Sequence, residues 1–354
     1  MKTANHLRCG FTTGSAMTAA AVAVYRNEKK SVDILLPHGE ILKIPIARQK
    51  PDEAVVIKDG GDDPDVTNNC EIVVKVERFE GNANSGDIEI PCGKGLLILR
   101  GGTGIGRVTR PGLAVPVGKA AINPGPCRIL AKNMEQAKFG NVSGEKLLIT
   151  VSVPAGEIIA QKTLNSTLGV EGGISILGNS GIVRPYSHEA YAATIALRLR
   201  SLAACGVKTV AFTTGNKSTD AIRRDYPELL SDATIPIADF IKEAINSAVK
   251  EKFEQIIIGC MPGKLFKYAC NFGNTHAHYN SLNLTDLRKM GVNLPDVALE
   301  EVKTMGALAA LIGKERYKEV LDNVYTQALA TLKSWAGTME LKLLLYDREG
   351  RKIR

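Results

Sequence analysis

Three segments in the second half of the sequence each follow a run of apolar, mostly β-branched residues and carry residue types that bind small ligands. They are Thr213-Thr214-Gly215-Asn216, Asp239, and Cys260-Met261-Pro262-Gly263-Lys264. In an open parallel sheet, the carboxyl ends of the strands form the edge at which ligands bind. We therefore expect these segments to meet at one edge of a sheet.

Gly215 and Asp239 fit a nucleoside ligand. A glycine lets a ligand approach the backbone at the start of the following helix, and a carboxylate about one β-α unit later can accept hydrogen bonds from a ribose. The alternative is that Asp239 only caps its helix, and the sequence favours neither interpretation. The chain has no G-x-x-x-x-G-K-[ST] and this half has no G-x-G-x-x-G, which argues against P-loop and dinucleotide sites.

His276 and His278, two residues apart, are two of the five histidines. On a strand they would share a face and could bind a metal ion, but the sequence offers no third ligand and no H-E-x-x-H spacing. We predict no metal site. His276 is instead expected to contact the nucleoside.

The densest acidic cluster, Asp59-Gly60-Gly61-Asp62-Asp63-Pro64-Asp65, follows a predicted strand that ends at Lys58. Its carboxylates could bind a divalent ion or hold a substrate group. The composition alone favours the other interpretation, a turn whose side chains cap backbone amides. The spacing differs from that of an EF-hand loop.

Two glycine-rich segments also lie in the first half. The segment from Gly101 to Gly106 has Arg107 where a dinucleotide fingerprint needs its third glycine, so a tight turn is favoured. The segment from Gly169 to Gly178 runs on to Arg184 and offers many backbone amides, which can cradle an anion beside the guanidinium. A loop that crosses between domains, with an exposed Arg184, is equally compatible with the sequence.

The elements that must position these residues differ between the two halves. After about residue 190, strands alternate with amphipathic helices, which predicts a small Rossmann-like domain with a parallel sheet. The expected helices are 189–204, 218–230, 239–252 and one from 264, and the expected strands are 207–213, 234–237 and 255–260.

The first half predicts an α+β domain with a mostly antiparallel sheet. An alanine-rich helix follows Thr12-Thr13-Gly14-Ser15, and strands are expected at 32–36, 41–46, 54–58, 72–76, 96–99 and 147–153. We place the first domain at 1–187 and the second at 188–336. The last strand, within 337–354, is expected to return to the first domain.

Composition narrows the function classes. The 354-residue chain is 44% hydrophobic and 23% charged, as in ordinary globular proteins, and lacks a secretory signal or long apolar run, so we expect a cytoplasmic protein. Seven scattered cysteines argue against a disulfide framework or a structural zinc site. The net charge of +8 indicates an anionic partner. With only 5% aromatic residues, nucleic acid is the less favoured partner.

Many of these segments together resemble the CbiD family of cobalt-precorrin-5B (C1)-methyltransferases. The resemblance is carried, in order, by Gly10 to Gly14, Leu36 to Gly39, Lys58-Asp59 with Gly61 to Thr67, Gly101 to Gly118, Ala121 to Pro124, Thr163 with Asn165, Leu168-Gly169, Gly172 to Gly178, Gly181 to Pro185, Gly263 to Leu265, and Asn274 to His276. So many segments in one order are specific, and they cover most of the chain.

The resemblance implies S-adenosyl-L-methionine as methyl donor, a cobalt-precorrin as acceptor, a first domain similar to ribosomal protein S5 domain 2, and a Rossmann-like second domain. The acceptor's acetate and propionate groups would explain the basic charge. A homodimer is one option. We expect no nucleic-acid or membrane partner and assign no catalytic acid or base. The expected donor contacts are Thr214, Gly215, Asn216, Asp239, Gly263, Lys264 and His276, and the expected acceptor contacts are Thr12, Thr13, Lys58, Asp59, Asp62, Asp63, Thr163, Asn165, Gly172, Gly173 and Arg184.

Two other classes stay open. A small-molecule kinase is conceivable because an S5-like fold is shared with a kinase superfamily, but the serine-rich phosphate loop is not visible. A basic nucleic-acid-binding protein is the option without catalysis.

Overall fold

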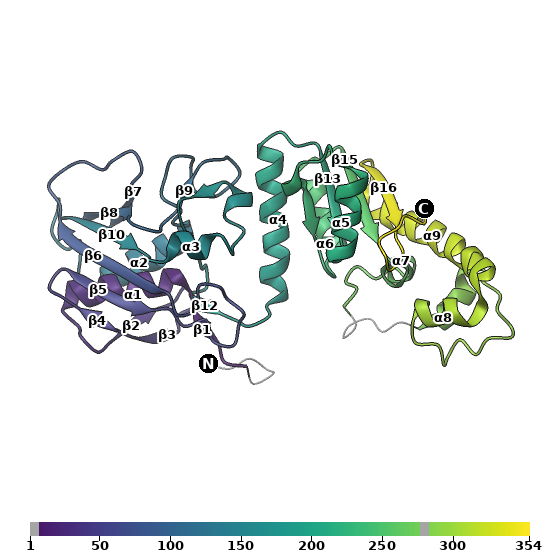
Figure 1. Cartoon of the computed structure of the whole chain (residues 1–354). Coiled ribbons are helices and arrows are strands. Elements are labelled where there is room, and N and C mark those ends of the chain that lie inside the picture. The colour runs from purple at the N-terminus through teal and green to yellow at the C-terminus, as the bar shows by residue number, and fades with distance from the viewer. Residues whose placement is uncertain (1–6, 277–282) are drawn as a thin grey trace. The chain divides into compact units, whose positions relative to one another are not determined.

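A computed structural model describes residues 7–276 and 283–354 of the chain (Figure 1). It contains two compact units, Met1–Ser187 and His188–Arg354. Within the described ranges, no helix combines the length and the apolar character that crossing a bilayer requires.

The first unit is built on a six-stranded sheet with the order β4-β5-β6-β10-β8-β7. Neighbouring strands are antiparallel except for β10 and β8, so the prediction of a mostly antiparallel α+β unit is confirmed. The strands are β4 (Arg48–Gln49), β5 (Glu53–Ile57), β6 (Glu71–Arg78), β7 (Ile88–Cys92), β8 (Gly95–Gly101) and β10 (Lys146–Ser152).

Helix α1 (Thr13–Arg26) explains the alanine-rich run near the start of the chain. It contacts β5 and β6 of the sheet, the helix α2 (Pro124–Gln136), and β2 (Ser31–Leu35), which pairs with β3 (Ile41–Pro45). Residues Thr13 to Val24 are all buried. Small side chains are required because this helix is enclosed on nearly every side.

The two glycine-rich segments of the first unit lie against each other. Strand β9 (Arg107–Val108) pairs with β11 (Val170–Glu171), and isolated bridges join Ile105 to Ile174 and Ile122 to Ile176. We call residues 101–122 and 169–178 together the glycine-rich layer. Near it lie α3 (Gly156–Ala160) and the 3-10 turn η1 (Ser166–Leu168), while β1 (Gly10–Phe11) pairs with β12 (Ile182–Val183).

The second unit contains a four-stranded, fully parallel sheet with the order β14-β13-β15-β16. The strands are β13 (Thr209–Thr213), β14 (Thr234–Pro236), β15 (Gln255–Cys260) and β16 (Glu340–Leu345). The prediction of a parallel sheet in this half is confirmed. The expected strand 207–213 begins two residues later, and the expected strand 255–260 matches β15.

Helices cover both faces of this sheet. Helix α5 (Asn216–Asp225) packs on one face with Ala211 and Ile257. The other face is covered by α4 (His188–Ala204), α6 (Ile241–Lys250), α7 (Pro262–Ala269) and α9 (Lys314–Ala336). The remaining helical segments are η2 (Ser231–Ala233), η3 (Leu284–Met290) and α8 (Met305–Ile312).

The last strand corrects one prediction. We expected the C-terminal strand to return to the first domain, but β16 pairs in parallel with β15, from Gln255 opposite Glu340 to Cys260 opposite Leu345. Alternate residues Leu341, Leu343 and Leu345 enter the main core of the second unit. The strand therefore completes the parallel sheet because its apolar face is buried against α9 and its neighbours.

Candidate functional site

The strand order creates a crevice at the carboxyl edge of the parallel sheet. From β13 the chain passes through α5 to β14 on one side, and from β14 it crosses through α6 to β15 on the other side of β13. The segments after β13 and β15 therefore diverge at a topological switch point, where open α/β sheets bind ligands. Gly215 follows β13 and Gly263 follows β15, as the sequence predicted.

Both glycines leave open space where a side chain would stand. A Cβ built on Gly215 or on Gly263 meets no protein atom within 4 Å. Two side chains of α5 hold the turn at Gly215 in place. The Ser218 and Thr219 hydroxyls both donate to the Gly215 carbonyl, over 2.9 and 3.0 Å. A rigid, bare backbone at the start of α5 can accept a ligand at close range.

Asp239 lies three residues after β14 and is the centre of a polar network. Its Oδ1 accepts hydrogen bonds from Lys264 Nζ and, over 2.7 Å, from Thr275 Oγ1. Lys264 Nζ also donates to Thr275 Oγ1 over 2.7 Å. The network joins Asp239 and Lys264, two residues predicted for the donor site, and adds Thr275, to which the sequence analysis gave no role.

The carboxylate of Asp239 is held ionised. Burial raises the pKa of this carboxyl group. The hydrogen bonds from Lys264 and Thr275 lower the pKa, and together with the nearby positive charge of Lys264 they outweigh burial, so the pKa lies below its usual value. The hydrogen bonds that Asp239 side-chain atoms accept from the described residues go to Oδ1. Oδ2 is therefore the atom through which this carboxylate can accept a ligand hydroxyl. Helix α6 receives no side-chain cap from its N-cap residue Phe240.

Aromatic rings gather beside Asp239. Tyr191 and Phe240 are stacked with ring centroids 5.1 Å apart, and His188 meets Phe240 edge-on at 5.5 Å. His276 lies edge-on to His188 at 5.7 Å. A cavity of about 340 Å³ opens here, lined by His188, Glu189, Ala192, Phe240, Glu243 and Asn274. Such rings can pack against a flat heterocycle, and only His276 among them was predicted.

A second cavity, of about 430 Å³, opens at the carboxyl ends of β15 and β16. Its wall includes Gly263, a predicted donor contact, and the neighbouring Met261 and Pro262 of the same predicted segment. The other lining residues come from distant segments and were not predicted, and they include Thr304, Met305, Gly306, Tyr317 and Arg348. Among the described residues, no group of three or more histidine, cysteine, aspartate or glutamate side chains is placed to hold a metal ion, and His278 lies outside those residues.

Lys58 requires a correction. It was predicted to contact the acceptor, but its side chain is only 2% exposed and its Nζ forms an ion pair with Asp65. Asp65 also accepts hydrogen bonds from the amide and the hydroxyl of Thr67, over 2.8 and 2.6 Å. Burial raises the pKa of Asp65, and the Lys58 and Thr67 hydrogen bonds bring it below its usual value. The pair therefore stabilises the fold from inside, and the buried Lys58 ammonium is committed to Asp65.

The acidic cluster forms a turn, the interpretation that composition favoured. Asp59 pairs with Arg8 and accepts the Gly61 amide over 2.8 Å. Asp62 accepts the Arg8 amide over 2.6 Å, and Asp63 accepts the Tyr186 amide over 3.0 Å. These carboxylates are committed mainly to holding the chain segments around them together.

Four further residues predicted for the acceptor form hydrogen bonds within the first unit. Thr12 caps α1 by accepting the Ser15 amide over 3.2 Å, and Thr13 accepts the Leu177 amide over 2.8 Å. Thr163 donates to the Ala160 carbonyl over 2.8 Å, and buried Asn165 donates to the Gly173 carbonyl over 3.0 Å. Thr12, Thr13 and Asn165 are buried, so these three are structural groups of the described fold rather than surface contacts.

The last three residues predicted for the acceptor differ in whether they are open to a ligand. They are Gly172, Gly173 and Arg184. A Cβ on Gly173 would lie 2.2 Å from the Gly104 carbonyl oxygen, so this glycine is needed for the close approach of two backbones. Gly172 has open space around its Cα, and Arg184 is exposed. Of the residues predicted for the acceptor, these two remain the best placed to meet a ligand.

Comparison with known proteins adds to this geometry. A model of the CbiD family matches residues 1–185. The chain is also 39% identical over 352 residues to a cobalt-precorrin-5B C(1)-methyltransferase of Nitratidesulfovibrio vulgaris, covering 94% of this chain and 88% of that protein. The chain belongs to the CbiD family. The resemblance found in the sequence is thereby confirmed.

Two other relatives match this chain along nearly its whole length. A cobalt-precorrin-5B C(1)-methyltransferase of Geobacter sulfurreducens is 36% identical over 96% of this chain and 97% of its own. One from a Polaromonas species is 34% identical over 98% of this chain and 96% of its own. A crystal structure of a cobalamin biosynthesis protein, CbiD of Archaeoglobus fulgidus, matches 75% of this chain and 80% of its own at 28% identity and a TM-score of 0.41.

Proposed function

We propose that this chain transfers a methyl group from S-adenosyl-L-methionine to C1 of cobalt-precorrin-5B, giving cobalt-precorrin-6A in anaerobic cobalamin biosynthesis. The observation that carries the proposal is the similarity to CbiD-family methyltransferases over nearly the whole chain. The basic charge of +8 suits an acceptor that carries many carboxylates.

The donor site of this proposal is the carboxyl edge of the parallel sheet in the second unit. Asp239 Oδ2 would accept a ribose hydroxyl, while the open backbone at Gly215 and Gly263 would admit the ligand to the crevice. The cavity beside Phe240 and His188 would take the base. Thr214 and Asn216 flank Gly215, and Lys264 and His276 lie around Asp239, so they complete the proposed set.

The acceptor side of this proposal rests on the first unit. Arg184 would form a forked hydrogen bond to a ring carboxylate, and the amides around Gly172 would lie beside it. We also propose the finer fold assignment, a first unit like ribosomal protein S5 domain 2 and a Rossmann-like second unit. The sheet orders and the helices on both faces of the parallel sheet support it.

The task of the protein in this reaction is orientation. The bound donor supplies an electrophilic methyl group. The chain would hold the ribose at Asp239 and keep water from the crevice, and fixing two reactants in this way can supply a large part of the rate enhancement. Lys264 and Thr275 would keep Asp239 charged and in place. No described side chain is assigned as acid or base.

Thermal stabilisation by S-adenosylhomocysteine is the test. A ligand that binds only the folded protein raises the midpoint temperature of unfolding. At a ligand concentration one hundred times the Kd, the free energy of unfolding increases by about 2.7 kcal/mol. We expect S-adenosylhomocysteine to stabilise the chain and ATP to leave it unchanged. Stabilisation by ATP alone would favour a kinase, and a salt-dependent gel shift with random RNA would favour a nucleic-acid-binding protein.

A further inference from the structure

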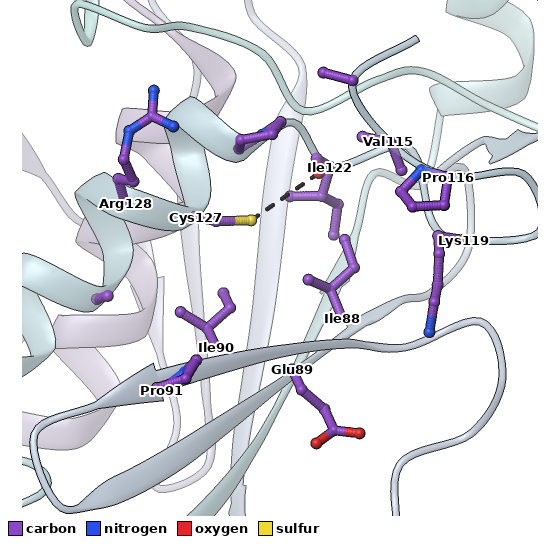
Figure 2. Close-up of a pocket in the computed structure, with 13 residues that line it drawn as sticks. Ile88, Glu89, Ile90, Pro91, Val115, Pro116, Lys119, Ile122, Cys127 and Arg128 are labelled. Carbon is purple, nitrogen blue, oxygen red and sulfur yellow. Dashed lines mark hydrogen bonds between the residues drawn. The ribbon is translucent and has the colours of Figure 1, made fainter. Parts of the chain in front are cut away.

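The first unit contains an apolar pocket that no predicted site residue lines. It measures about 470 Å³ and lies between β7, the segment 114–122, and the first turns of α2 (Figure 2). Its walls are mainly carbon, and they are formed by Ile88, Ile90, Pro91, Ala114, Val115, Pro116, Ile122, Pro124, Cys127 and Ala131.

Charged side chains lie only at the rim of this pocket. In Figure 2 the Ile88, Ile90 and Ile122 side chains gather in the middle, while the charged ends of Arg128 and Glu89 extend outward. Lys119 Nζ donates to the Asp87 carbonyl over 2.7 Å. Arg128 is exposed on α2 and takes part in no ion pair among the described residues. An apolar floor with an unpaired cation at its edge fits an amphipathic anion.

One wall of the pocket belongs to the glycine-rich layer. Val115 and Ile122 belong to its first segment, and Ile122 is bridged to Ile176 of its second segment. The Ala121 carbonyl accepts the Ile176 amide over 2.8 Å, and the Asn123 amide donates to the Ile176 carbonyl over 3.0 Å. The second segment also carries Gly172, so one wall of the pocket is hydrogen-bonded to a segment to which we assign acceptor binding.

We propose that this pocket is a subsite for the acceptor, holding one pyrrole-derived ring with its methyl groups against Ile88, Ile90 and Ile122 and a ring carboxylate at Arg128. This inference rests on the proposed function and adds the apolar contacts that it lacks. A volume of about 470 Å³ accommodates an edge of a tetrapyrrole, not the whole macrocycle. Burial of the apolar surface of such an edge favours binding. The Arg128 contact adds selectivity for the acid form.

Cobyrinic acid, a corrin with free carboxylates, and its uncharged heptamethyl ester are the probes. We expect Arg128→Glu to weaken binding of the acid about tenfold or more and to leave binding of the ester nearly unchanged, because only the acid loses a charge-assisted contact. Lys132→Glu is the matched control. Lys132 is exposed on the same helix and does not line the pocket, so the same change of charge there should have less than about a threefold effect.

A second variant tests the apolar floor. Ala114 lines the pocket but is itself exposed, so Ala114→Trp can fill the cavity without disturbing the core. We expect it to weaken binding of both the acid and the ester about tenfold. Val142→Trp, at a residue that is 67% exposed and remote from the pocket lining, controls for an added surface tryptophan. Unchanged S-adenosylhomocysteine binding and thermal unfolding show that each variant is folded.

Three outcomes separate the inference from the proposed function. Equal binding of the acid by wild type, Arg128→Glu and Ala114→Trp overturns the subsite and leaves the methyltransferase intact. A wild type that binds neither S-adenosylhomocysteine nor cobyrinic acid overturns the proposed function. Variants that change the oligomeric state in light scattering, with unaltered corrin affinity, identify the pocket as a contact between copies and also overturn the subsite.

Discussion

Lys264 Nζ donates to Asp239 Oδ1, and this ion pair joins the first turn of α7 to the segment that follows β14 at the carboxyl edge of the parallel sheet. Thr275 closes the triangle by donating to the same oxygen over 2.7 Å. The side chains of Lys264 and Asp239 are 25% and 22% exposed, so both charges are partly withdrawn from water. The pair therefore positions the proposed ribose contact and stabilises the second unit at once.

Asp239→Ala should weaken S-adenosylhomocysteine binding about tenfold or more in a calorimetric titration. The variant removes the carboxylate that would accept a ribose hydroxyl, and hydrogen bonds to a charged group contribute about 1.5–3 kcal/mol. Asp239→Asn keeps the shape and one acceptor oxygen, so it should lie between wild type and Asp239→Ala. Asp220→Ala, at an exposed aspartate of α5, is the control. An unaltered affinity for Asp239→Ala would remove Asp239 from the donor site.

The Lys264–Asp239 pair also predicts a pH-dependent stability. The folded-state pKa of Asp239 is lowered from its usual 3.8, so the contribution of the pair is complete above that pH and is lost as the pH falls through the lowered value. In urea unfolding at pH 7, Lys264→Met should reduce the free energy of unfolding by about 1–3 kcal/mol. The difference from wild type should shrink below pH 3.8.

A matched control separates this pair from general charge effects. Lys342 approaches Glu340 to 3.8 Å, with side chains 48% and 60% exposed. Exposed pairs contribute about 0–1 kcal/mol, so Lys342→Met should change stability little at any pH. A Lys264→Met deficit that does not shrink as the pH is lowered from 3.8 until wild type itself unfolds would contradict the assignment to Asp239.

Lys58→Ala should destabilise the first unit by about 3 kcal/mol, because it leaves the partly buried Asp65 carboxylate without its cation. Lys50→Ala, which removes an exposed pair with Glu53 in the same sheet, should cost less than about 1 kcal/mol. The measurement is urea unfolding at pH 7. Because Lys58 is not among the proposed donor contacts, S-adenosylhomocysteine affinity should be unchanged in the folded variant, and the double variant Lys58→Met with Asp65→Leu should recover much of the loss.

Lys58 also illustrates how far the sequence could predict this molecule. The apolar runs located β5, β6, β10, β13 and β15 to within two residues at each end, because local alternation and β-branching determine where a strand forms. The same pattern ends at Lys58, where a lysine at a strand end suggests a surface residue. Its burial depends on Asp65, seven positions later, and on the turn that brings the two together.

Non-local pairing is the part that the sequence did not reveal. The strand β16 was recognised, but its neighbour was not, because a parallel strand does not encode its partner in its own residues. The ring cluster of Tyr191, Phe240 and His188 was missed for the same reason, since it draws on two helical segments. The placement of Asp239 and Gly215 at one sheet edge was predicted because the ends of parallel strands converge there by topology, whichever residues pair.

Two glycine variants separate ligand binding from stability. Gly215→Ala should weaken binding, whereas Gly173→Ala should lower stability. The Cβ added at Gly215 meets no protein atom within 4 Å, so stability should change by less than about 1 kcal/mol while S-adenosylhomocysteine binding weakens. The Cβ added at Gly173 would lie 2.2 Å from the Gly104 carbonyl oxygen, so that variant should lose about 1–3 kcal/mol or more. Titration calorimetry and urea unfolding measure the two effects. A Gly215→Ala variant that binds as wild type would show that no ligand approaches this turn.

Arg184→Ala should weaken acceptor binding and leave donor binding intact. The exposed guanidinium can form two parallel hydrogen bonds to one ring carboxylate, and the loss of a charge-assisted contact predicts about a tenfold lower affinity for cobyrinic acid. Arg78→Ala is the matched control, because Arg78 is also exposed in the same unit but lies at the end of β6, outside the segments assigned to the acceptor. Titrations with cobyrinic acid and with S-adenosylhomocysteine report the two affinities. If Arg184→Ala weakened donor binding more than acceptor binding, Arg184 would belong to the other substrate, and the acceptor would have to be held by other cations of the first unit.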